Sequence, residues 1–308
     1  MTLDPRRALL GGLGVFALGF VAVWASDIRA ARRGPADPHL GPVRRPSALE
    51  ALVGLLSNFF DTLGIGSFAP TTSVFKLLKM VPDEDIPGTL NVGDAIPTFL
   101  EAFAFIAVVE VAPKTLILMF AAAILGAWLG AGVVARLPRR RIQLGMGVAL
   151  LAAAVFFLMG NLGLFPAGGA ALGLSGARLA IAVAGNFVLG ALMTLGIGAY
   201  APCMILVSLL GMNPKAAFPI MMGSCAFLMP VACARFIRLR RYRLAPALGL
   251  TLGGIPGVLV AAYIVKSLPL QAVRWLVIAV VVYAAVVMLR SAAVEGRAPG
   301  GGAKARGA

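Results

Sequence analysis

The sequence predicts an all-helical membrane protein with one N-terminal span followed by two homologous halves. Of its 308 residues, 60% are hydrophobic and 13% are charged, whereas a soluble domain carries about 25% charged residues. Nine apolar runs approach or exceed the roughly 20 residues that a membrane-spanning helix needs. A nine-residue segment of the first half also returns in the second half. These observations exclude an ordinary soluble domain.

Two of the apolar runs are too long for one ordinary span. Residues 49–78 and 179–210 each extend over about 30 residues and contain glycine and proline near their middle. Glycine loosens a helix, and proline removes a backbone donor and clashes with the preceding turn, so each run is expected to break there. The other runs are closer in length to a single span: 8–25, 92–109, 115–134, 142–159, 216–233, 244–265 and 272–289.

The two over-long runs share a motif. Thr62-Leu-Gly-Ile-Gly-Ser-Phe-Ala-Pro70 returns 132 positions later as Thr194-Leu-Gly-Ile-Gly-Ala-Tyr-Ala-Pro202. A second motif, Leu-Leu-x-Met-x-Pro, begins at Leu77 and again at Leu209. The repetition predicts an N-terminal span (1–28), an arginine-rich cytoplasmic loop (29–48), a first repeat (49–160), a connecting loop (161–177), a second repeat (178–290) and a disordered basic tail (291–308).

The distribution of arginine predicts that the two repeats are inverted. The loop 136–141 is basic and its counterpart 267–272 is uncharged, whereas the loop 235–243 carries five arginines and its counterpart around Glu110 is acidic or neutral. Basic loops stay in the cytoplasm, so equivalent loops lie on opposite sides of the membrane. Inversion needs an odd number of crossings, which a re-entrant hairpin followed by three spans provides. Two parallel halves of four spans each are the alternative.

The net charge of +15 has two interpretations. In a soluble protein it would indicate a nucleic-acid partner. Here the arginines lie in short loops between apolar runs, and no nucleic-acid-binding motif is present. We therefore attribute the charge to membrane orientation, with a cytoplasmic C-terminus, and expect no nucleic acid as a partner.

The broken segments predict an anion site. The helix that follows each break is expected to begin near Ser67 or Ala199, with a proline in its first turn. Its free N–H groups and the positive end of its dipole would then lie near the membrane midplane. Two such ends from opposite sides suit a small anion; close helix packing by small residues is the alternative. The candidate binding residues are Gly64, Gly66, Ser67, Pro70, Thr71, Thr72, Gly196, Gly198, Tyr200, Pro202 and Cys203.

Three carboxylates lie within apolar runs of the first half, and their counterparts in the second half are apolar or small. Charges at membrane depth usually mark ion paths or proton relays, so Asp61, Asp94 and Glu101 are candidates for proton coupling. A structural alternative has Asp61 capping a helix break and Asp94 starting a helix. Lys76 and Lys79 are expected to snorkel to the cytoplasmic surface.

The cysteines do not form a recognisable redox or metal motif. Cys203, Cys225 and Cys233 are scattered on apolar segments without C-x-x-C spacing, so we interpret them as small buried hydrophobic residues. No metal-ligand cluster, phosphate-binding loop or Ser/His/Asp set appears in the sequence. We therefore expect no metal, no cofactor and no enzymatic activity.

The Gly-x-Gly break followed by proline near the start of each half resembles the sulfite exporter TauE/SafE family of permeases. The resemblance covers roughly residues 49–289, and its strongest elements are the two copies of Thr-Leu-Gly-Ile-Gly and of Met-x-Pro. It implies movement of sulfur oxyanions, organosulfonates and similar small anions across the bacterial inner membrane without ATP. It also implies a substrate role for Gly64, Gly66, Gly196 and Gly198, with the prolines beside them.

The sequence as a whole predicts a multi-pass secondary transporter of a small anion such as sulfite or sulfoacetate, with proton-coupled export as the working hypothesis. Its partners are the substrate and the lipid bilayer, and a homo-oligomer stays open. Two alternatives belong to other classes: a membrane thiol-redox carrier using Cys203, Cys225 and Cys233, and a non-transporting membrane scaffold.

Overall fold

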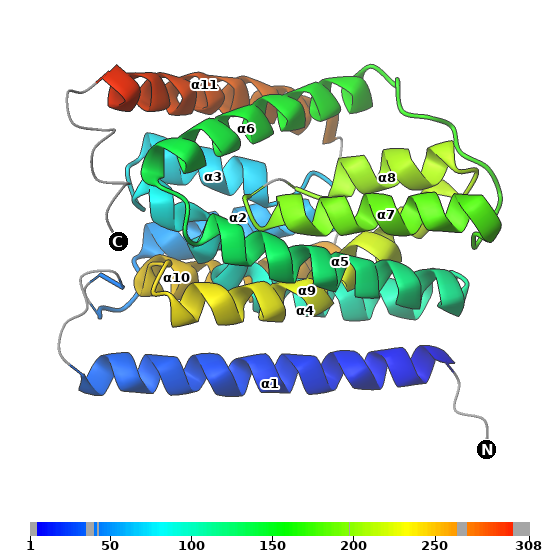
Figure 1. Cartoon of the computed structure of the whole chain (residues 1–308), viewed down its shortest axis with the longest axis horizontal. Helices are drawn as coiled ribbons and strands as arrows, with labels where there is room; N and C mark the ends of the chain where they lie inside the picture. The colour runs from blue at the N-terminus through cyan, green and yellow to red at the C-terminus, as the bar shows by residue number, and fades with distance from the viewer. Residues whose placement is uncertain (1–4, 35–39, 42, 197, 264–269, 298–308) are drawn as a thin grey trace.

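The computed structural model describes residues 5–34, 40–41, 43–196, 198–263 and 270–297. Within these residues the fold is all-helical, apart from an isolated β-bridge between Ala171 and Met212. Most helices lie side by side along one direction, as Figure 1 shows. In chain order they are α1 (Pro5–Arg33), α2 (Ala48–Thr62), α3 (Phe68–Leu77), η1 (Asp83–Asp85), α4 (Ile86–Val108), α5 (Pro113–Val134), α6 (Arg139–Asn161), α7 (Gly176–Met193), α8 (Tyr200–Leu209), η2 (Pro214–Ala216), α9 (Ala217–Arg238), α10 (Leu244–Tyr263) and α11 (Leu270–Arg297).

Eight helices of the described residues are long and apolar enough to cross a membrane. Seven of them are the unbroken helices α1, α4, α5, α6, α9, α10 and α11. The eighth is α7, which is followed by a break and the short helix α8. The prediction of an all-helical, multi-pass membrane protein is therefore confirmed.

Both over-long apolar runs fold as two helices joined by a glycine-containing turn. Between α2 and α3, Gly64 and Gly66 have φ angles of 87° and 92°, and Gly196 between α7 and α8 has a φ of 101°. Residues that carry a side chain rarely adopt such positive φ angles, so the backbone favours glycine at these three positions. Ile197 lies outside the described residues. Pro70 and Pro202 stand in the first turns of α3 and α8, where a missing N–H costs nothing.

Each broken helix pair begins and ends at the same end of the bundle. For α7 and α8, the Gly169 N–H donates to the Met212 carbonyl over 3.0 Å and the Asn213 N–H donates to the Ala171 carbonyl over 2.9 Å. These bonds tie the segment before α7 to the segment after α8. The pair α2 and α3 lies toward the opposite end, on the left of Figure 1. We call this the arginine-rich end, because it also carries the α5–α6 and α9–α10 loops.

The two halves have the same element order, and their packing is similar when the halves are exchanged. Helix α2 packs on α10 and α7 packs on α5, while α4 lies against α9 and α6 against α11. Glycines allow the first two contacts. A Cβ atom at Gly126 of α5 would lie 2.0 Å from the Phe187 carbonyl oxygen, and one at Gly253 of α10 would lie 1.8 Å from that of Ala51. Small residues allow this close backbone approach.

A proline in the middle of α4 frees a backbone acceptor, and a neighbouring helix satisfies it. Pro97 cannot donate to the carbonyl of Gly93, four residues earlier. Instead, the Thr251 hydroxyl of α10 donates to that carbonyl over 2.6 Å. The exchange is needed because an unpaired backbone group in a membrane costs several kcal/mol.

Helix α1 lies along α4 and α9 on one side of the bundle, at the bottom of Figure 1. Near the arginine-rich end, Arg240 pairs with Asp27 of α1 over 2.6 Å, and the Tyr242 hydroxyl donates to the same carboxylate over 2.5 Å. Burial raises the pKa of the Tyr242 phenol, which therefore stays protonated and keeps its donor.

Several expectations from the sequence differ from the structure. Helix α11 continues to Arg297, past the start of the predicted disordered tail at 291, because Ala292 is buried and its carbonyl accepts from Arg140 of α6. Helix α1 continues to Arg33, beyond residue 28. Asp94 lies inside α4 and does not start a helix. Lys76 does not snorkel, because its ammonium pairs with Asp83.

The close contact at Gly126 predicts a specific sensitivity to added volume. We expect Gly126→Ala to lower the midpoint of thermal unfolding in detergent, because overpacking of this kind costs about 1–3 kcal/mol. The matched control is Gly12→Ala in α1, where an added Cβ meets nothing within 4 Å. The control should be neutral or stabilising, since alanine favours a helix over glycine by about 1 kcal/mol. Equal midpoints for the two variants would contradict the packing described.

Candidate functional site

The two helix breaks meet at a small cavity in the middle of the bundle. Gly66 of the first break and Gly198 of the second both line it, together with Glu101 of α4 and Cys225 of α9. Its volume of about 30 Å³ is that of roughly one water molecule. A second cavity of about 30 Å³ lies on another side of the same two glycines and reaches Pro202. The turns of both broken segments are thus adjacent.

Two of the three predicted carboxylates belong to this cavity. Glu101 is fully buried, and its Oε1 accepts a hydrogen bond of 2.8 Å from the Thr62 hydroxyl. Its Oε2 has no partner among the described residues. Asp61 is partly buried and accepts a 2.6 Å hydrogen bond from the Ser67 hydroxyl. A protonated carboxyl group at Glu101 could therefore donate a hydrogen bond into the cavity.

The third carboxylate lies outside the cavity. Asp94 is fully buried, and its Oδ1 accepts a 3.0 Å hydrogen bond from the Asn58 amide of α2. It is absent from the cavity lining, which holds Asp61 and Glu101. The structure thus separates Asp94 from the other two candidates.

The N-terminus of α3 is open toward the break. Ser67 precedes this helix but makes no side-chain cap, because its hydroxyl donates to Asp61. The first N–H groups of α3 have no partner within the helix, and they carry the positive end of its dipole. Thr71 and Thr72 are buried, and their hydroxyls have no partner among the described side chains and backbone. Thr72 Oγ1 faces the second break, 3.9 Å from a Cβ placed on Gly196.

The remaining candidates from the second half contribute less to the cavity. Cys203 is fully buried within α8 and does not line the cavity. The Tyr200 side chain lies outside the described part of the structure, although α8 begins at this residue. The Met193 and Cys225 sulfur atoms lie 3.2 Å apart and complete the wall from α7 and α9.

Sequence reasoning missed some residues of this cavity. Thr62 was recognised as the first residue of the repeated motif but was not assigned a role, and its bond to Glu101 places it beside the carboxyl group. Thr98 stands one turn before Glu101 on α4, so helical periodicity could have indicated it. Met193 and Cys225 carry no comparable sequence signal.

The three cysteines are free and buried, as the interpretation as small hydrophobic residues requires. Among the described residues, no group of three or more His, Cys, Asp and Glu side chains could hold a metal ion. Nothing in this arrangement favours the thiol-redox alternative.

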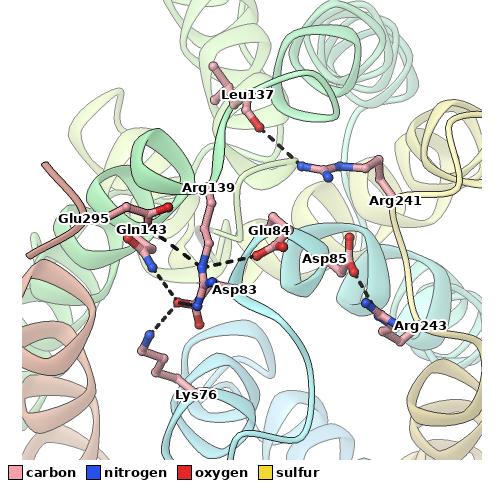
Figure 2. A network of polar contacts seen from close by, with 10 residues as sticks. All are labelled: Lys76, Asp83, Glu84, Asp85, Leu137, Arg139, Gln143, Arg241, Arg243 and Glu295. Carbon is pink, nitrogen blue, oxygen red and sulfur yellow. Dashed lines mark hydrogen bonds and ion pairs between the residues drawn. The ribbon is translucent and has the colours of Figure 1, made fainter. Parts of the chain in front are cut away.

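A polar network ties the first broken segment to α6 at the arginine-rich end, and Figure 2 shows its members. Asp83 of η1 binds the Lys76 ammonium of α3 over 2.6 Å and the Gln143 amide of α6 over 2.8 Å. Nearby, Arg243 pairs with Asp85 over 2.9 Å. The segment that follows α3 is therefore held by Gln143 of α6 in the first half and by Arg243, just before α10, in the second half.

The corresponding place in the second half lacks these charges. Ser208 and Lys215 stand 132 positions after Lys76 and Asp83. The Ser208 hydroxyl is buried without a partner in the described part of the chain. The two ends of the bundle therefore differ in their charged side chains, even though the two halves of the chain have the same order of helices.

Comparison with protein families identifies the chain. The model of the family described as Sulfite exporter TauE/SafE matches residues 2–157, just over half of the 308 residues. The chain belongs to this family. The match covers α1, the first broken segment and nearly all of α6. Comparisons with curated proteins and with solved structures returned no match.

Membership in the TauE/SafE family confirms the resemblance found in the sequence and identifies a multi-pass membrane transporter. The family is one of transporters and not of enzymes, and it implies sulfur-containing anions as substrates. Membership in this family does not favour the alternative of a membrane scaffold that transports nothing.

The buried pair of Lys76 and Asp83 generates a stability prediction. Their side chains are 10% and 6% exposed, so Asp83→Asn leaves a buried ammonium without its counter-charge. We expect a loss of about 3–5 kcal/mol, seen as a lower thermal unfolding midpoint in detergent.

The double variant Lys76→Met with Asp83→Asn should recover most of that loss, because it removes both charges. Arg139→Gln serves as the control, since Arg139 is 53% exposed and lies 3.7 Å from Asp83. An exposed ion pair contributes about 0–1 kcal/mol. A double variant no more stable than the single one would contradict the buried pair.

Proposed function

We propose that this TauE/SafE protein is a secondary transporter that exports a small sulfur oxyanion or organosulfonate, such as sulfite or sulfoacetate, together with protons. One observation carries the proposal: Gly66 and Gly198 from the two breaks line the same buried cavity as Glu101. Broken helices that meet near the midplane are the usual location of substrate and coupling ions in secondary transporters.

The proposal includes two inverted repeats that alternate access to this cavity. Three observations support the inversion. The helices follow the same order in both halves, and each helix packs on the counterpart of its partner's helix when the halves are exchanged. The two broken segments also enter from opposite ends of the bundle. Helices α2 to α6 form one repeat and α7 to α11 the other. Rocking of one repeat against the other would open the cavity to one side at a time.

Orientation follows from the positive-inside rule. The arginine-rich end carries Arg44, the arginines of the α5–α6 loop and those of the α9–α10 loop. We assign it to the cytoplasm of a bacterial inner-membrane protein. Arg6 and Arg7 lie near the opposite end, where the Arg6 Nε atom donates to the Ile106 carbonyl over 2.8 Å.

The anion site is assigned to the breaks. Backbone N–H groups at the start of α3 and α8 supply positive partial charge, and glycine allows a ligand to approach the backbone. Thr71 and Thr72 provide buried hydroxyls that have no partner among the described residues. A cavity of about 30 Å³ holds one water-sized group. Binding of a sulfur oxyanion therefore requires the hairpins to separate, as alternating access demands.

Proton coupling is assigned to Glu101 and Asp61. An anion beside two ionised carboxylates is repelled, so binding of the anion and protonation of Glu101 or Asp61 favour each other. Asp94 is given a structural role instead, because Asn58 binds it outside the cavity. A small anion and at least one proton then cross together.

Ligand binding is tested by thermal stability of the purified protein in detergent. The panel is sulfite, sulfate, thiosulfate, taurine, sulfoacetate and simple carboxylates, at matched ionic strength and two pH values. A bound anion at a hundred times its Kd stabilises the folded protein by about 2.7 kcal/mol. We expect a selective rise in the unfolding midpoint with a sulfur anion.

Gly198→Val should abolish this rise. An added Cβ atom at Gly198 meets nothing within 4 Å, and Gly198 lines the cavity, so the variant is expected to fold and to occupy part of the site. Gly12→Val in α1 is the matched control and should keep the response. A flat response of the wild type across the panel would count against a site for these anions.

Coupling is tested with sulfoacetate in proteoliposomes, because this dianion does not buffer near neutral pH. A pH-sensitive dye reports proton movement while labelled sulfoacetate leaves the vesicles. We expect protons to move with the anion in the wild type. Glu101→Gln should retain anion efflux down its gradient but lose proton movement, since the amide cannot exchange a proton.

Asp94→Asn is the matched control, with the same isosteric change in a fully buried carboxylate of the same helix. Its proton movement per anion should equal that of the wild type. Wild-type proton movement in Glu101→Gln, or its loss in Asp94→Asn alone, would reverse the assignment of the two carboxylates.

A further inference from the structure

A large groove runs between α1 and the face formed by α5 and α9, beside the contact that α1 makes with α9. Its volume is about 910 Å³. Side chains of α1, including Val15, Phe16 and Val23, form one wall, and Trp128 and Val231 belong to the other. Most of the groove lies along apolar surface that a membrane protein turns toward lipid chains.

The lining of the groove, apolar along most of its length, becomes positively charged at the arginine-rich end. Arg136, Arg235 and Arg238 line the groove there, and no Asp or Glu belongs to its lining. None of the three guanidinium groups makes an ion pair with a described carboxylate. Three positive charges thus stand at the mouth of an apolar groove without a counter-charge from the described chain.

One of these arginines is held in place by α5. The Arg235 guanidinium lies 4.7 Å from the centre of the Trp128 ring, a cation–π contact. Gly132 of α5 makes room for it, because a Cβ there would lie 3.0 Å from Arg235 Nη1. Packing against α5 therefore holds the Arg235 side chain against one wall of the groove.

We propose that this groove binds an anionic phospholipid, with its phosphate at Arg136, Arg235 and Arg238 and an acyl chain along α1. Guanidinium groups bind phosphate oxygens in a bidentate manner, and basic pockets beside membrane helices at the cytoplasmic side suit anionic headgroups. The apolar wall selects a lipid over a soluble phosphate. The three positive charges select an anionic headgroup over a zwitterionic one, whose ammonium group they repel.

The bound lipid would also fill the space between α1 and the rest of the bundle. Helix α1 reaches the bundle through Leu13, Phe20 and Trp24, which are buried. Other residues of this helix, such as Val15 in the groove wall and Leu18, are 69% and 73% exposed. A lipid in the groove therefore adds apolar contact to a helix with a narrow interface.

Native mass spectrometry of the full chain, with phosphatidylglycerol and phosphatidylcholine of identical acyl chains, tests the proposal. We expect phosphatidylglycerol to be retained at least ten times more tightly and to raise the thermal unfolding midpoint. Glycerol phosphate at matched ionic strength should neither bind nor stabilise.

The combined variant Arg136→Gln, Arg235→Gln and Arg238→Gln should lose this preference. Its control is Arg32→Gln, Arg33→Gln and Arg141→Gln, which removes three exposed charges near the same end but outside the groove. The control should retain the preference. Equal retention of the two lipids by the wild type, or equal loss in both triple variants, would overturn the proposal.

Gly19→Leu tests the acyl chain separately. Gly19 lines the groove, and an added Cβ meets nothing within 4 Å, so leucine fills the groove without disturbing α1. We expect weaker retention of phosphatidylglycerol with an unchanged unfolding midpoint in lipid-free detergent. Retention equal to the wild type would exclude the apolar groove and leave only surface attraction to the arginines. Strong binding of glycerol phosphate would instead identify a soluble anion as the ligand. Either result would overturn the lipid site.

Discussion

A backbone that leaves the helical state inside a membrane must bury its unpaired N–H and C=O groups within protein, and most of this structure depends on that constraint. The two glycine breaks would be costly if either faced lipid. Helices α6 and α11 cover them on one side, and α4, α5, α9 and α10 cover them on the other. The close approach of α2 to α10 and of α7 to α5 adds to this burial, and glycines at the contacts allow it.

The two breaks share a sequence motif, but the side chains around them differ in charge. Both halves keep the Gly-x-Gly break, but the membrane-depth carboxylates Asp61, Asp94 and Glu101 belong to the first half alone. The ion pair between Lys76 and Asp83 also has no counterpart at Ser208 and Lys215. The two breaks thus share a backbone motif, whereas charged side chains distinguish their surroundings.

The sequence predicted the broken segments because glycine and proline act locally on the backbone. Helix α3 begins at Phe68 and α8 at Tyr200, next to the expected positions Ser67 and Ala199. Partners of buried polar groups could not be predicted in the same way, because they depend on which helices meet. The bond from Thr62 to Glu101 joins residues 39 positions apart. The burial of Lys76 likewise required knowledge that α6 packs against η1, whose Asp83 binds both Lys76 and Gln143. Periodicity shows that a residue faces inward but not which residue it meets.

The proposed coupling between the anion and the proton can be given an approximate energy, and the membrane potential gives it a direction. Two like charges about 4 Å apart repel by about 4 kcal/mol at an effective dielectric constant near 20. Neutralising one carboxyl group beside the breaks would therefore favour an anion by a factor of about a thousand. A dianion that leaves with one proton still carries one negative charge outward. A membrane potential that is negative inside contributes about 2.3 kcal/mol per charge for each 100 mV. Proton-linked movement of such an anion is thus compatible with export, because the membrane potential acts on the remaining charge.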